Sequence, residues 1–315
     1  MLYQLSYTPV GAGASSGWCG AWQEHPFLAG AGLSAIICAV HSPAAPNVIE
    51  PELLMLAYRS GIFPMADSRD DPDVFWVEPQ DRAILPLDGM RCSRSLARAL
   101  RRGRFYVTCN EAFAEVMQAC AAPRRSNNEG ASGESWISGR IEASYVRLHR
   151  LGHAHSIECW QDDRLVGGLY GVGFDRVFCG ESMFSLVPDA SKVALAWLVA
   201  ALRRGGARLL DCQFITPHLA SLGAIEISQK RYLQLLKAAQ RPYVAAGLGE
   251  ADGLGEGFGV GAGVGDGEGL GAAAAGEALA LPAAFAALLA DADLAAGGSS
   301  SSPGNFIAQS LTQTS

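Results

Sequence analysis

The apolar run Leu-Leu-Asp-Cys-Gln-Phe at 209–214 constrains the fold more than any other stretch of this chain. Two glycines before it and Pro217 after it predict a short buried strand. Strand geometry places Asp211 and Gln213 on one face, with Cys212 on the other. A buried polar group without a partner costs about 2 to 7 kcal/mol. The two polar side chains therefore make a structural hydrogen bond between neighbours, or they belong to a site that handles a proton or an amine.

The elements expected on either side of this strand indicate an α+β fold. An amphipathic helix at 191–204 leads into the strand, and other helices are expected at 50–60, 93–103, 110–120, 138–151 and 228–239. Short strands are expected at 74–77 and 83–86, and a strand at 105–108 precedes an antiparallel meander from 154 to 179. The segments 62–65 and 122–135 are expected to be loops. This order predicts a mixed, mostly antiparallel sheet.

Composition divides the chain into four parts. Residues 1–48 are expected to be a poorly ordered extension, since their apolar patch at 27–40 is shorter than the roughly 20 residues of a membrane-spanning helix. No Lys or Arg precedes Arg59, so an export signal with a basic start is not expected. A small N-terminal domain at 49–90 and a larger domain at 91–243 follow. Residues 244–315 are expected to be a flexible Gly/Ala-rich tail with a marginal helix at 282–294 and no chemistry.

Charge and cysteine usage limit the class of protein. The formal net charge of −7 arises in the tail, because eight acidic residues and no Lys or Arg follow Arg241. Residues 1–243 carry a charge of +1, so the total does not argue against nucleic-acid binding by the folded part. The eight cysteines have no C-x-x-C spacing, which does not support a zinc ribbon or a thioredoxin-type site. Reduced thiols fit a cytosol best.

The helix expected at 93–103 carries a basic stripe. Helical spacing places Arg94, Arg98 and either Arg101 or Arg102 along one side. Such a stripe is either a solvated helix face or a contact for phosphates.

Three other motifs each allow a functional and a structural interpretation. The glycines between 167 and 173 have strands on both sides, whereas a dinucleotide-binding loop must open a helix, so close backbone approach explains them better. His149, His153 and His155 lack a further ligand at metal spacing, and local hydrogen bonds are expected for them. The run 180–185 is either the wall of a cavity or a strand end with a surface Glu181.

Taken together, the motifs resemble the leucyl/phenylalanyl-tRNA–protein transferases of bacteria. The resemblance extends from about Ile49 to Ala239. The motifs that carry it are Arg-Ser-Gly-Ile-Phe-Pro (59–64), Ser-Trp-Ile (135–137), Leu-Gly-His-Ala-His-Ser-Ile-Glu (151–158), Leu-Val-Gly-Gly-Leu-Tyr-Gly (165–171), Phe-Cys-Gly-Glu-Ser-Met-Phe-Ser (178–185), Ala-Ser-Lys (190–192), Asp-Cys-Gln (211–213) and Ala-Ser-Leu-Gly-Ala (220–224).

This resemblance implies a fold and a reaction. The larger domain would have the acyltransferase fold shared with GCN5-related N-acetyltransferases, behind a small α/β N-terminal domain. The protein would be a cytoplasmic, monomeric aminoacyltransferase that moves Leu or Phe, less readily Met, from tRNA to the α-amino group of proteins beginning with Arg or Lys. The product is a degradation signal of the N-end rule. No metal or diffusible cofactor is implied, and no membrane.

The resemblance also implies catalytic and binding roles. Asp211 orients Gln213, and Gln213 draws on the attacking amine. Glu181 and Gly180 hold the aminoacyl end. Since the acceptor is cationic, it should seek a carboxylate, which either Glu181 or Asp211 could supply. A neutral amide is a poor base, so positioning is expected to supply much of the rate.

Further residues match substrate-binding positions of the family. The apolar pocket for the donor side chain is implied to be lined by Leu169, Phe178, Met183 and Leu195. Trp136 would stack on the terminal adenosine. Met65 stands where many relatives have Trp, so it offers only an apolar contact. The arginines Arg94, Arg98, Arg101 and Arg102 become candidates for binding the acceptor stem of the tRNA.

Two rival functions are compatible with the sequence. One is an acyl-CoA-dependent N-acetyltransferase of the same fold, whose usual Gly-rich turn is missing before residues 190–192. The other is a non-catalytic module that binds aminoacyl-tRNA ends or N-terminal peptides, against which the presence of Asp211, Gln213 and Glu181 argues.

Overall fold

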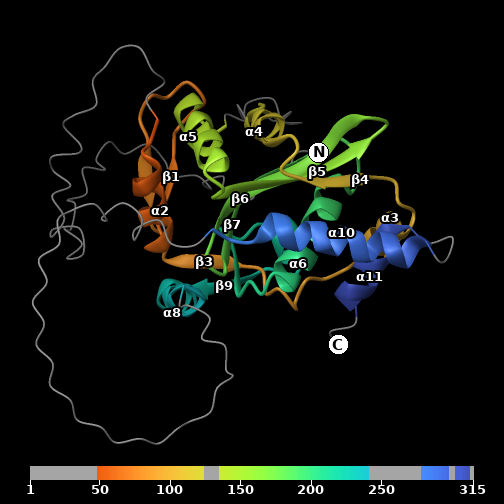
Figure 1. Cartoon of the computed structure of the whole chain (residues 1–315). Helices are drawn as coiled ribbons and strands as arrows, with labels where there is room; N and C mark the ends of the chain where they lie inside the picture. The colour runs from red at the N-terminus through yellow and green to blue at the C-terminus, as the bar shows by residue number, and fades with distance from the viewer. Residues whose placement is uncertain (1–47, 124–134, 241–277, 298–301, 313–315) are drawn as a thin grey trace, which may run out of the picture.

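The computed structural model describes residues 48–123, 135–240, 278–297 and 302–312 (Figure 1). The extension predicted for 1–48 and the Gly-rich part of the predicted tail, 244–277, lie almost entirely outside these ranges, as does most of the loop predicted at 122–135.

Seven strands of the described ranges form one sheet in the order β4-β5-β6-β7-β8-β3-β9. Strands β7 and β8 pair in parallel, and all other neighbours in this order pair antiparallel, which confirms the predicted mixed, mostly antiparallel sheet. The strands are β3 (Asp81–Ile84), β4 (Tyr106–Cys109), β5 (Ala154–Gln161), β6 (Arg164–Phe174), β7 (Val177–Ser185), β8 (Leu209–Gln213) and β9 (Ile225–Ser228).

Helices cover both faces of the sheet. On one face lies α6 (Ala190–Arg204), together with α3 (Arg94–Arg101), and their side chains share a core cluster with Leu169, Phe178 and Leu210. The other core cluster joins the sheet to α2 (Pro51–Arg59), α4 (Phe113–Ala121), α5 (Gly139–Arg150) and α8 (Gln229–Ala239). A single turn of helix, α7 (Pro217–Ser221), links β8 to β9.

Two segments of the first part of the chain differ from the prediction. The strand expected at 83–86 was assigned to the small domain, but β3 lies inside the large sheet between β8 and β9. Residues 62–65, expected to be a loop, contain β1 (Phe63–Met65), which pairs with β2 (Phe75–Val77) in a two-stranded sheet. The strand was not predicted because Pro64 lies in its middle. Proline argues against a strand, since it cannot donate a ladder hydrogen bond and is tolerated only where that bond is not needed.

The C-terminal part of the predicted flexible tail is folded onto the core, so the prediction was wrong for residues 278–297 and 302–312. Helix α10 (Leu281–Gly297) lies alongside α6, and α11 (Pro303–Thr312) lies beside α3 (Figure 1). Their apolar side chains, among them Phe285, Leu288 and Ile307, are buried in the same cluster as α6. As a result α6 is buried on nearly all sides instead of along one stripe.

Candidate functional site

Strands β7 and β8 separate in the middle of the sheet. Their parallel pairing covers three residue pairs and ends at Cys179 and Asp211. Each strand carries an irregularity at that point: β7 shifts register against β6 so that Glu181 has no opposite residue, and β8 shifts against β3 so that Cys212 has none. Bulges of this kind re-aim side chains and are common next to active sites. Gly180, Glu181 and Gln213 therefore lie next to each other at the place where β7 and β8 separate.

Gln213 and Glu181 are joined across this gap. Gln213 Nε2 donates to Glu181 Oε1 at 2.8 Å, and both side chains are buried. Tyr145 places its hydroxyl 3.5 Å from the other Glu181 oxygen, and Tyr58 shares a hydrogen bond with Tyr145. Burial raises the pKa of Glu181 from its ordinary value of 4.5 to about 8. Glu181 is thus a buried carboxyl whose burial favours its neutral form, and the alternative of a surface Glu at this position was wrong.

Asp211 is held by an arginine that the sequence reading missed. Arg82 donates to it twice, from Nε to Oδ1 at 2.9 Å and from Nη2 to Oδ2 at 2.6 Å, and both residues are almost fully buried. Tyr232 donates to Oδ2 at 2.9 Å, and the backbone N–H of Gln213 donates to Oδ1 at 2.9 Å. The Asp211 carboxylate therefore has a charged partner and four hydrogen bonds, which is how a buried charge becomes tolerable.

Arg82 is itself fixed from three directions. Its guanidinium lies 4.8 Å from the ring of Phe63 and 4.4 Å from the ring of Tyr232, and Nη1 donates to the carbonyl of Gly61 at 2.9 Å. Desolvation lowers the pKa of Arg82, but the Asp211 carboxylate outweighs it and the net direction is upward, so the guanidinium stays charged. Arg82, Asp211, Gln213, Glu181, Tyr58, Tyr145 and Tyr232 form one hydrogen-bonded group, called the polar cluster below.

The backbone of Gln213 is in the left-handed region, with φ of 60°. A non-glycine residue in this region costs roughly 1 to 2 kcal/mol. The N–H bond to Asp211 holds Gln213 in this conformation, so Asp211 controls the direction of the Gln213 side chain.

The predicted apolar pocket residues lie on the side of the sheet that faces α6. Leu169 and Met183 are opposite each other on β6 and β7, and Phe178 and Leu195 are buried in the same core cluster. Trp136 and Met65 belong to the other cluster, and the backbone N–H of Ala66 donates to the Trp136 carbonyl. The two groups thus lie on opposite faces of the sheet.

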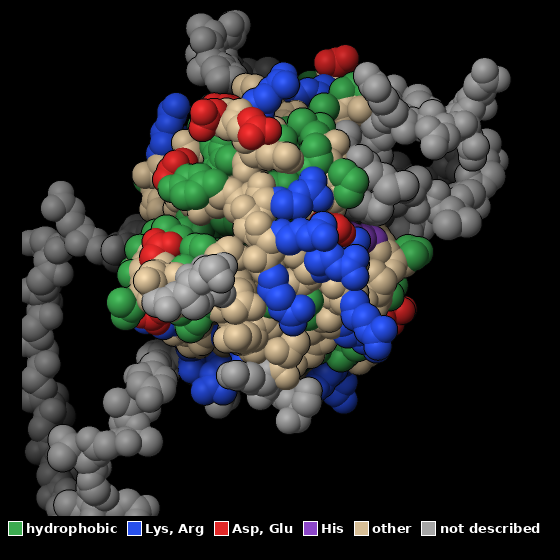
Figure 2. All heavy atoms as spheres, turned by 90° about the vertical axis from the view of Figure 1, so that its right-hand side faces the viewer, with side chains coloured by type: hydrophobic (Ala, Val, Ile, Leu, Met, Phe, Trp, Pro, Cys, Tyr) green, Lys and Arg blue, Asp and Glu red, His purple; other side chains and the backbone are tan. Residues whose placement is uncertain are grey.

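The predicted phosphate-binding arginines are all exposed on α3 and the residue after it: Arg94, Arg98, Arg101 and Arg102. Figure 2 shows Lys and Arg side chains gathered on the face at the right-hand side of Figure 1, where α3 lies. This patch is separate from the polar cluster.

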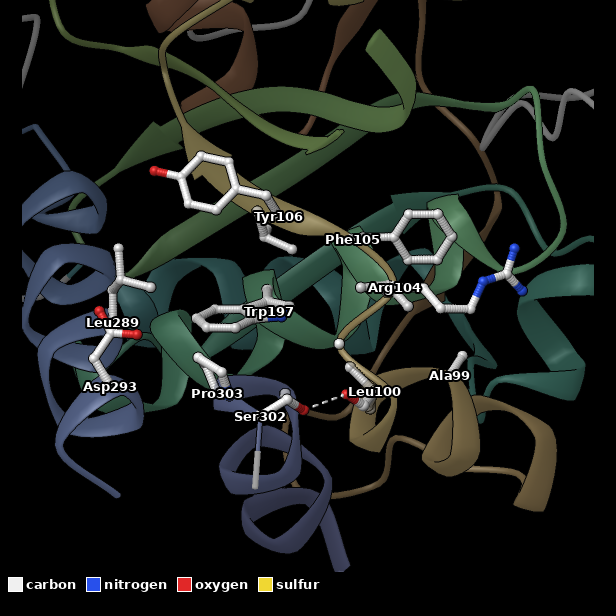
Figure 3. Close-up of a pocket in the computed structure, with 14 residues that line it drawn as sticks. Ala99, Leu100, Arg104, Phe105, Tyr106, Trp197, Leu289, Asp293, Ser302 and Pro303 are labelled. Carbon is white, nitrogen blue, oxygen red and sulfur yellow. Dashed lines mark hydrogen bonds between the residues drawn. The ribbon is translucent and has the colours of Figure 1, made fainter. Parts of the chain in front are cut away.

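A cavity of about 300 Å³ lies near this patch, away from the polar cluster (Figure 3). It is lined by residues of α3, β4, α6, α10 and the start of α11, with Trp197, Tyr106 and Leu289 on its walls. No buried charge or unpaired polar group among its lining residues indicates a ligand, within the part of the chain that the structure describes.

The remaining motifs have structural explanations. A Cβ on Gly171 would lie 2.2 Å from the carbonyl of Cys179, so the strands can approach only with glycine there, as expected. His149 stacks on Phe113 and bonds to the Ala154 carbonyl, and His155 bonds to Asn110. For His153 the expected side-chain hydrogen bond is not made by Nδ1, which is buried without a partner among the described residues. The described ranges contain no group of three His, Cys, Asp or Glu side chains that could hold a metal ion. Nor does any helix in them have the length and hydropathy to cross a membrane.

Three residues of the polar cluster could not be identified from the sequence, and for the same reason. Arg82 precedes the strand expected at 83–86, and nothing local distinguishes it from a surface arginine. Tyr58 and Tyr145 read as ordinary members of amphipathic helices. The one available signal was indirect, because a buried Asp211 needs a cation from elsewhere in the chain.

Most of the described core matches proteins of one known family. Residues 84–237 match the family model "Leucyl/phenylalanyl-tRNA protein transferase", and residues 47–80 match the model for the N-terminal domain of the same proteins. A leucyl/phenylalanyl-tRNA–protein transferase of Novosphingobium aromaticivorans is 67% identical over 270 residues, which are 86% of this chain and 98% of that protein. Proteins of the same name from Rhizorhabdus wittichii and Zymomonas mobilis are 58% identical over 205 residues and 56% identical over 197 residues. These matches cover 65% and 62% of this chain, and 80% and 72% of the relatives.

Proposed function

The chain belongs to the leucyl/phenylalanyl-tRNA–protein transferase family, and from this premise we propose that the polar cluster is its aminoacyl-transfer site. The reaction is transfer of Leu or Phe from aminoacyl-tRNA to the amino terminus of a protein. One observation carries the assignment: the hydrogen bond from Gln213 to Glu181, made where β7 and β8 separate.

The chemistry is aminolysis of an ester. The amine nitrogen attacks the carbonyl carbon, the bond from that carbon to the ribose oxygen breaks, and the amine proton ends on the ribose oxygen. An α-amine has an ordinary pKa near 8, so much of it is protonated at neutral pH. The protonated form must lose a proton before its nitrogen can attack. Burial raises the pKa of Glu181 to about 8. Two groups with matched pKa values exchange a proton at little cost, which favours Glu181 as the group that takes it.

Gln213 is proposed to hold the amine in line. Its amide nitrogen donates to Glu181, so its carbonyl oxygen is the atom that can accept from the attacking amine. Asp211 is not assigned proton transfer, because it is neutralised by Arg82 and accepts from Tyr232 and the Gln213 backbone. Asp211 is therefore a positioning residue, and Gln213 and Glu181 are the catalytic residues.

The donor amino acid is proposed to bind beside the divergence of β7 and β8. Gly180 and Glu181 hold the aminoacyl end, and the donor side chain enters the apolar cluster toward α6: Leu169, Phe178, Met183 and Leu195. An apolar site accepts Leu, Phe and, less well, Met but excludes polar side chains. Trp136 stacks on the terminal adenosine, with an apolar contact from Met65.

The acceptor is proposed to be a protein that begins with Arg or Lys. Since Arg82 neutralises Asp211, Glu181 is the acidic group of the polar cluster that we assign to the cationic acceptor end, whose charge would favour the ionised form of Glu181. The modified protein then carries an N-terminal degradation signal. The enzyme acts in the cytoplasm as a monomer, without metal or diffusible cofactor.

The exposed arginines of α3 are proposed to bind the acceptor stem of the tRNA. A cluster of Arg side chains supplies the charge that phosphates require. The order of helices around a mostly antiparallel sheet, with two parallel strands that separate at the site, supports a likeness of the larger domain to the GCN5-related N-acetyltransferases.

Transfer of label tests the proposal. The protein is incubated with labelled Phe-tRNA and an Arg-starting peptide, and in parallel with labelled acetyl-CoA and the same peptide. Phe should appear on the peptide and acetyl should not; transfer from acetyl-CoA alone would overturn the proposal. Asp211→Ala should reduce transfer far more than it weakens aminoacyl-tRNA binding, whereas equal losses would indicate a structural role.

A further inference from the structure

The C-terminal helices lie against the helix that carries the arginine patch. The two family models end at or before residue 237, so α10 and α11 lie outside the matched regions. Helix α3 has eight residues and buries Leu96, Ala97, Ala99 and Leu100. A helix this short is unstable alone, because helices below about 12 residues are marginal in water. Its order therefore depends on what its buried face contacts, and α11 supplies part of that contact.

Ser302 completes the end of α3. The last carbonyls of a helix lack partners within the helix. The Ser302 hydroxyl lies 3.1 Å from the carbonyl of Leu100 and 2.8 Å from that of Arg101, about 200 residues away in the chain (Figure 3). It supplies a donor to the last turn of α3, where Arg98 and Arg101 lie.

The fit between α11 and α3 is close at the backbone. A Cβ on Gly304 would lie 2.2 Å from the carbonyl oxygen of Leu100, so the first turn of α11 can approach only with glycine. Further along α11, Ile307, Ala308 and Leu311 are buried in the cluster that includes Leu96 and Leu100.

Helix α6 fixes the other side of α11. Arg203 donates from Nη1 to the carbonyl of Ser310 at 3.0 Å, and Trp197 contacts Phe285 of α10 with ring centroids 5.6 Å apart. The C-terminal helices are thus tied both to the core and to α3.

We propose that residues 302–312 act as a brace that holds α3 in place, so that its exposed arginines form a preorganised surface for the tRNA acceptor stem. Ser302 and Gly304 are positioning residues in this brace. Ordering a binding surface in advance lowers the entropic cost of binding. The inference rests on the proposed function, and it gives a role in tRNA affinity to a segment to which the sequence assigned none.

Two phenylalanyl donor substrates distinguish a role of the brace in tRNA binding from a general effect on stability. Phe-tRNA contacts both the polar cluster and the arginines, whereas 3′-O-phenylalanyl-adenosine lacks the acceptor stem. For Gly304→Val we expect KM for Phe-tRNA to rise about tenfold and its dependence on salt to weaken, since phosphate contacts are lost. The rate with phenylalanyl-adenosine should stay within about twofold of wild type. Ser302→Ala should raise KM for Phe-tRNA about threefold, as expected for loss of a modest hydrogen bond.

Ser310→Ala is the matched control. The Ser310 hydroxyl bonds inside its own helix, to the Ile307 carbonyl, so its removal should leave KM for Phe-tRNA unchanged. The proposed brace would be refuted if Gly304→Val lost activity equally with Phe-tRNA and with phenylalanyl-adenosine. An unchanged KM for Phe-tRNA in Ser302→Ala would refute it as well. If Gly304→Val does not fold, Ser302→Ala alone decides. Failure of the wild-type protein to transfer Phe from either donor would refute the proposed function instead.

Discussion

Replacement of Arg82 by methionine is expected to destabilise the protein strongly. Methionine retains much of the apolar contact with Phe63 and Tyr232 but removes the charge. Asp211 would then be a buried carboxylate that has lost two hydrogen bonds, of 2.9 and 2.6 Å. The loss of the partner charge of Asp211, and not the loss of packing, should account for most of the fall in the free energy of unfolding.

The size of the effect follows from the burial of the pair. The side chains of Arg82 and Asp211 are 2% and 0% exposed, so solvent does not screen them. Removal of one partner of a buried ion pair costs about 3 to 5 kcal/mol. This is a large part of the total stability of an ordinary domain, about 5 to 15 kcal/mol.

A double-mutant cycle measures the pair itself. The free energy of unfolding is determined by urea titration for wild type, Arg82→Met, Asp211→Asn and the double variant. Removing both charges leaves neither one uncompensated, so the double variant should be more stable than the sum of the single losses predicts, by about 2 kcal/mol or more. Single losses that add within about 0.5 kcal/mol would refute the view that Arg82 serves chiefly as the charge partner of Asp211.

Two further predictions concern Glu181 and the glycines. Because the pKa of Glu181 rises from 4.5 unfolded to about 8 folded, the folded protein holds an extra proton between these pH values. The free energy of unfolding should therefore fall as pH rises through this window, and urea titrations should show a flatter decline in Glu181→Gln; parallel curves would contradict the assignment. Gly171→Ala should destabilise by about 1 to 3 kcal/mol in thermal unfolding, because its Cβ would meet the Cys179 carbonyl at 2.2 Å. Gly139→Ala, with nothing within 4 Å, is the control and should change little.

The strand at 209–213 shows what local sequence can predict. Apolar residues bounded by glycines and a proline identified it as buried, and its period of two separated Cys212 from Asp211. The mostly antiparallel sheet followed from the order of helices and strands. Both inferences depend on residues close to one another in the chain, where periodicity carries the information.

Long-range pairing could not be inferred in the same way. Strand β9 was not predicted at all, and β3 was not expected in the large sheet, since each is short and stabilised by partners far away in the sequence. The salt bridge of Arg82 to Asp211 spans 129 residues. A buried carboxylate indicates that a cation exists, but not which one.

The C-terminal helices illustrate a third limit. An Ala-rich sequence such as that at 281–297 gives only marginal helicity alone, so composition predicted a flexible tail. Its stability comes from covering the outer side of α6, through residues such as Phe285 and Leu288. Helical stability in proteins derives mainly from such tertiary contacts, which composition does not reveal.

The most direct test of the account compares two adjacent residues of β8. Gln213 points toward Glu181, whereas Cys212 is buried in the cluster under α6. Single-turnover transfer of labelled Phe from Phe-tRNA to an Arg-starting peptide is measured for Gln213→Ala and Cys212→Ala. The rate should fall on the order of a hundredfold in Gln213→Ala and only slightly in Cys212→Ala, with Phe-tRNA bound about equally by both. Wild-type transfer by Gln213→Ala, or equal losses in the two variants, would contradict the claim that the polar cluster is the transfer site.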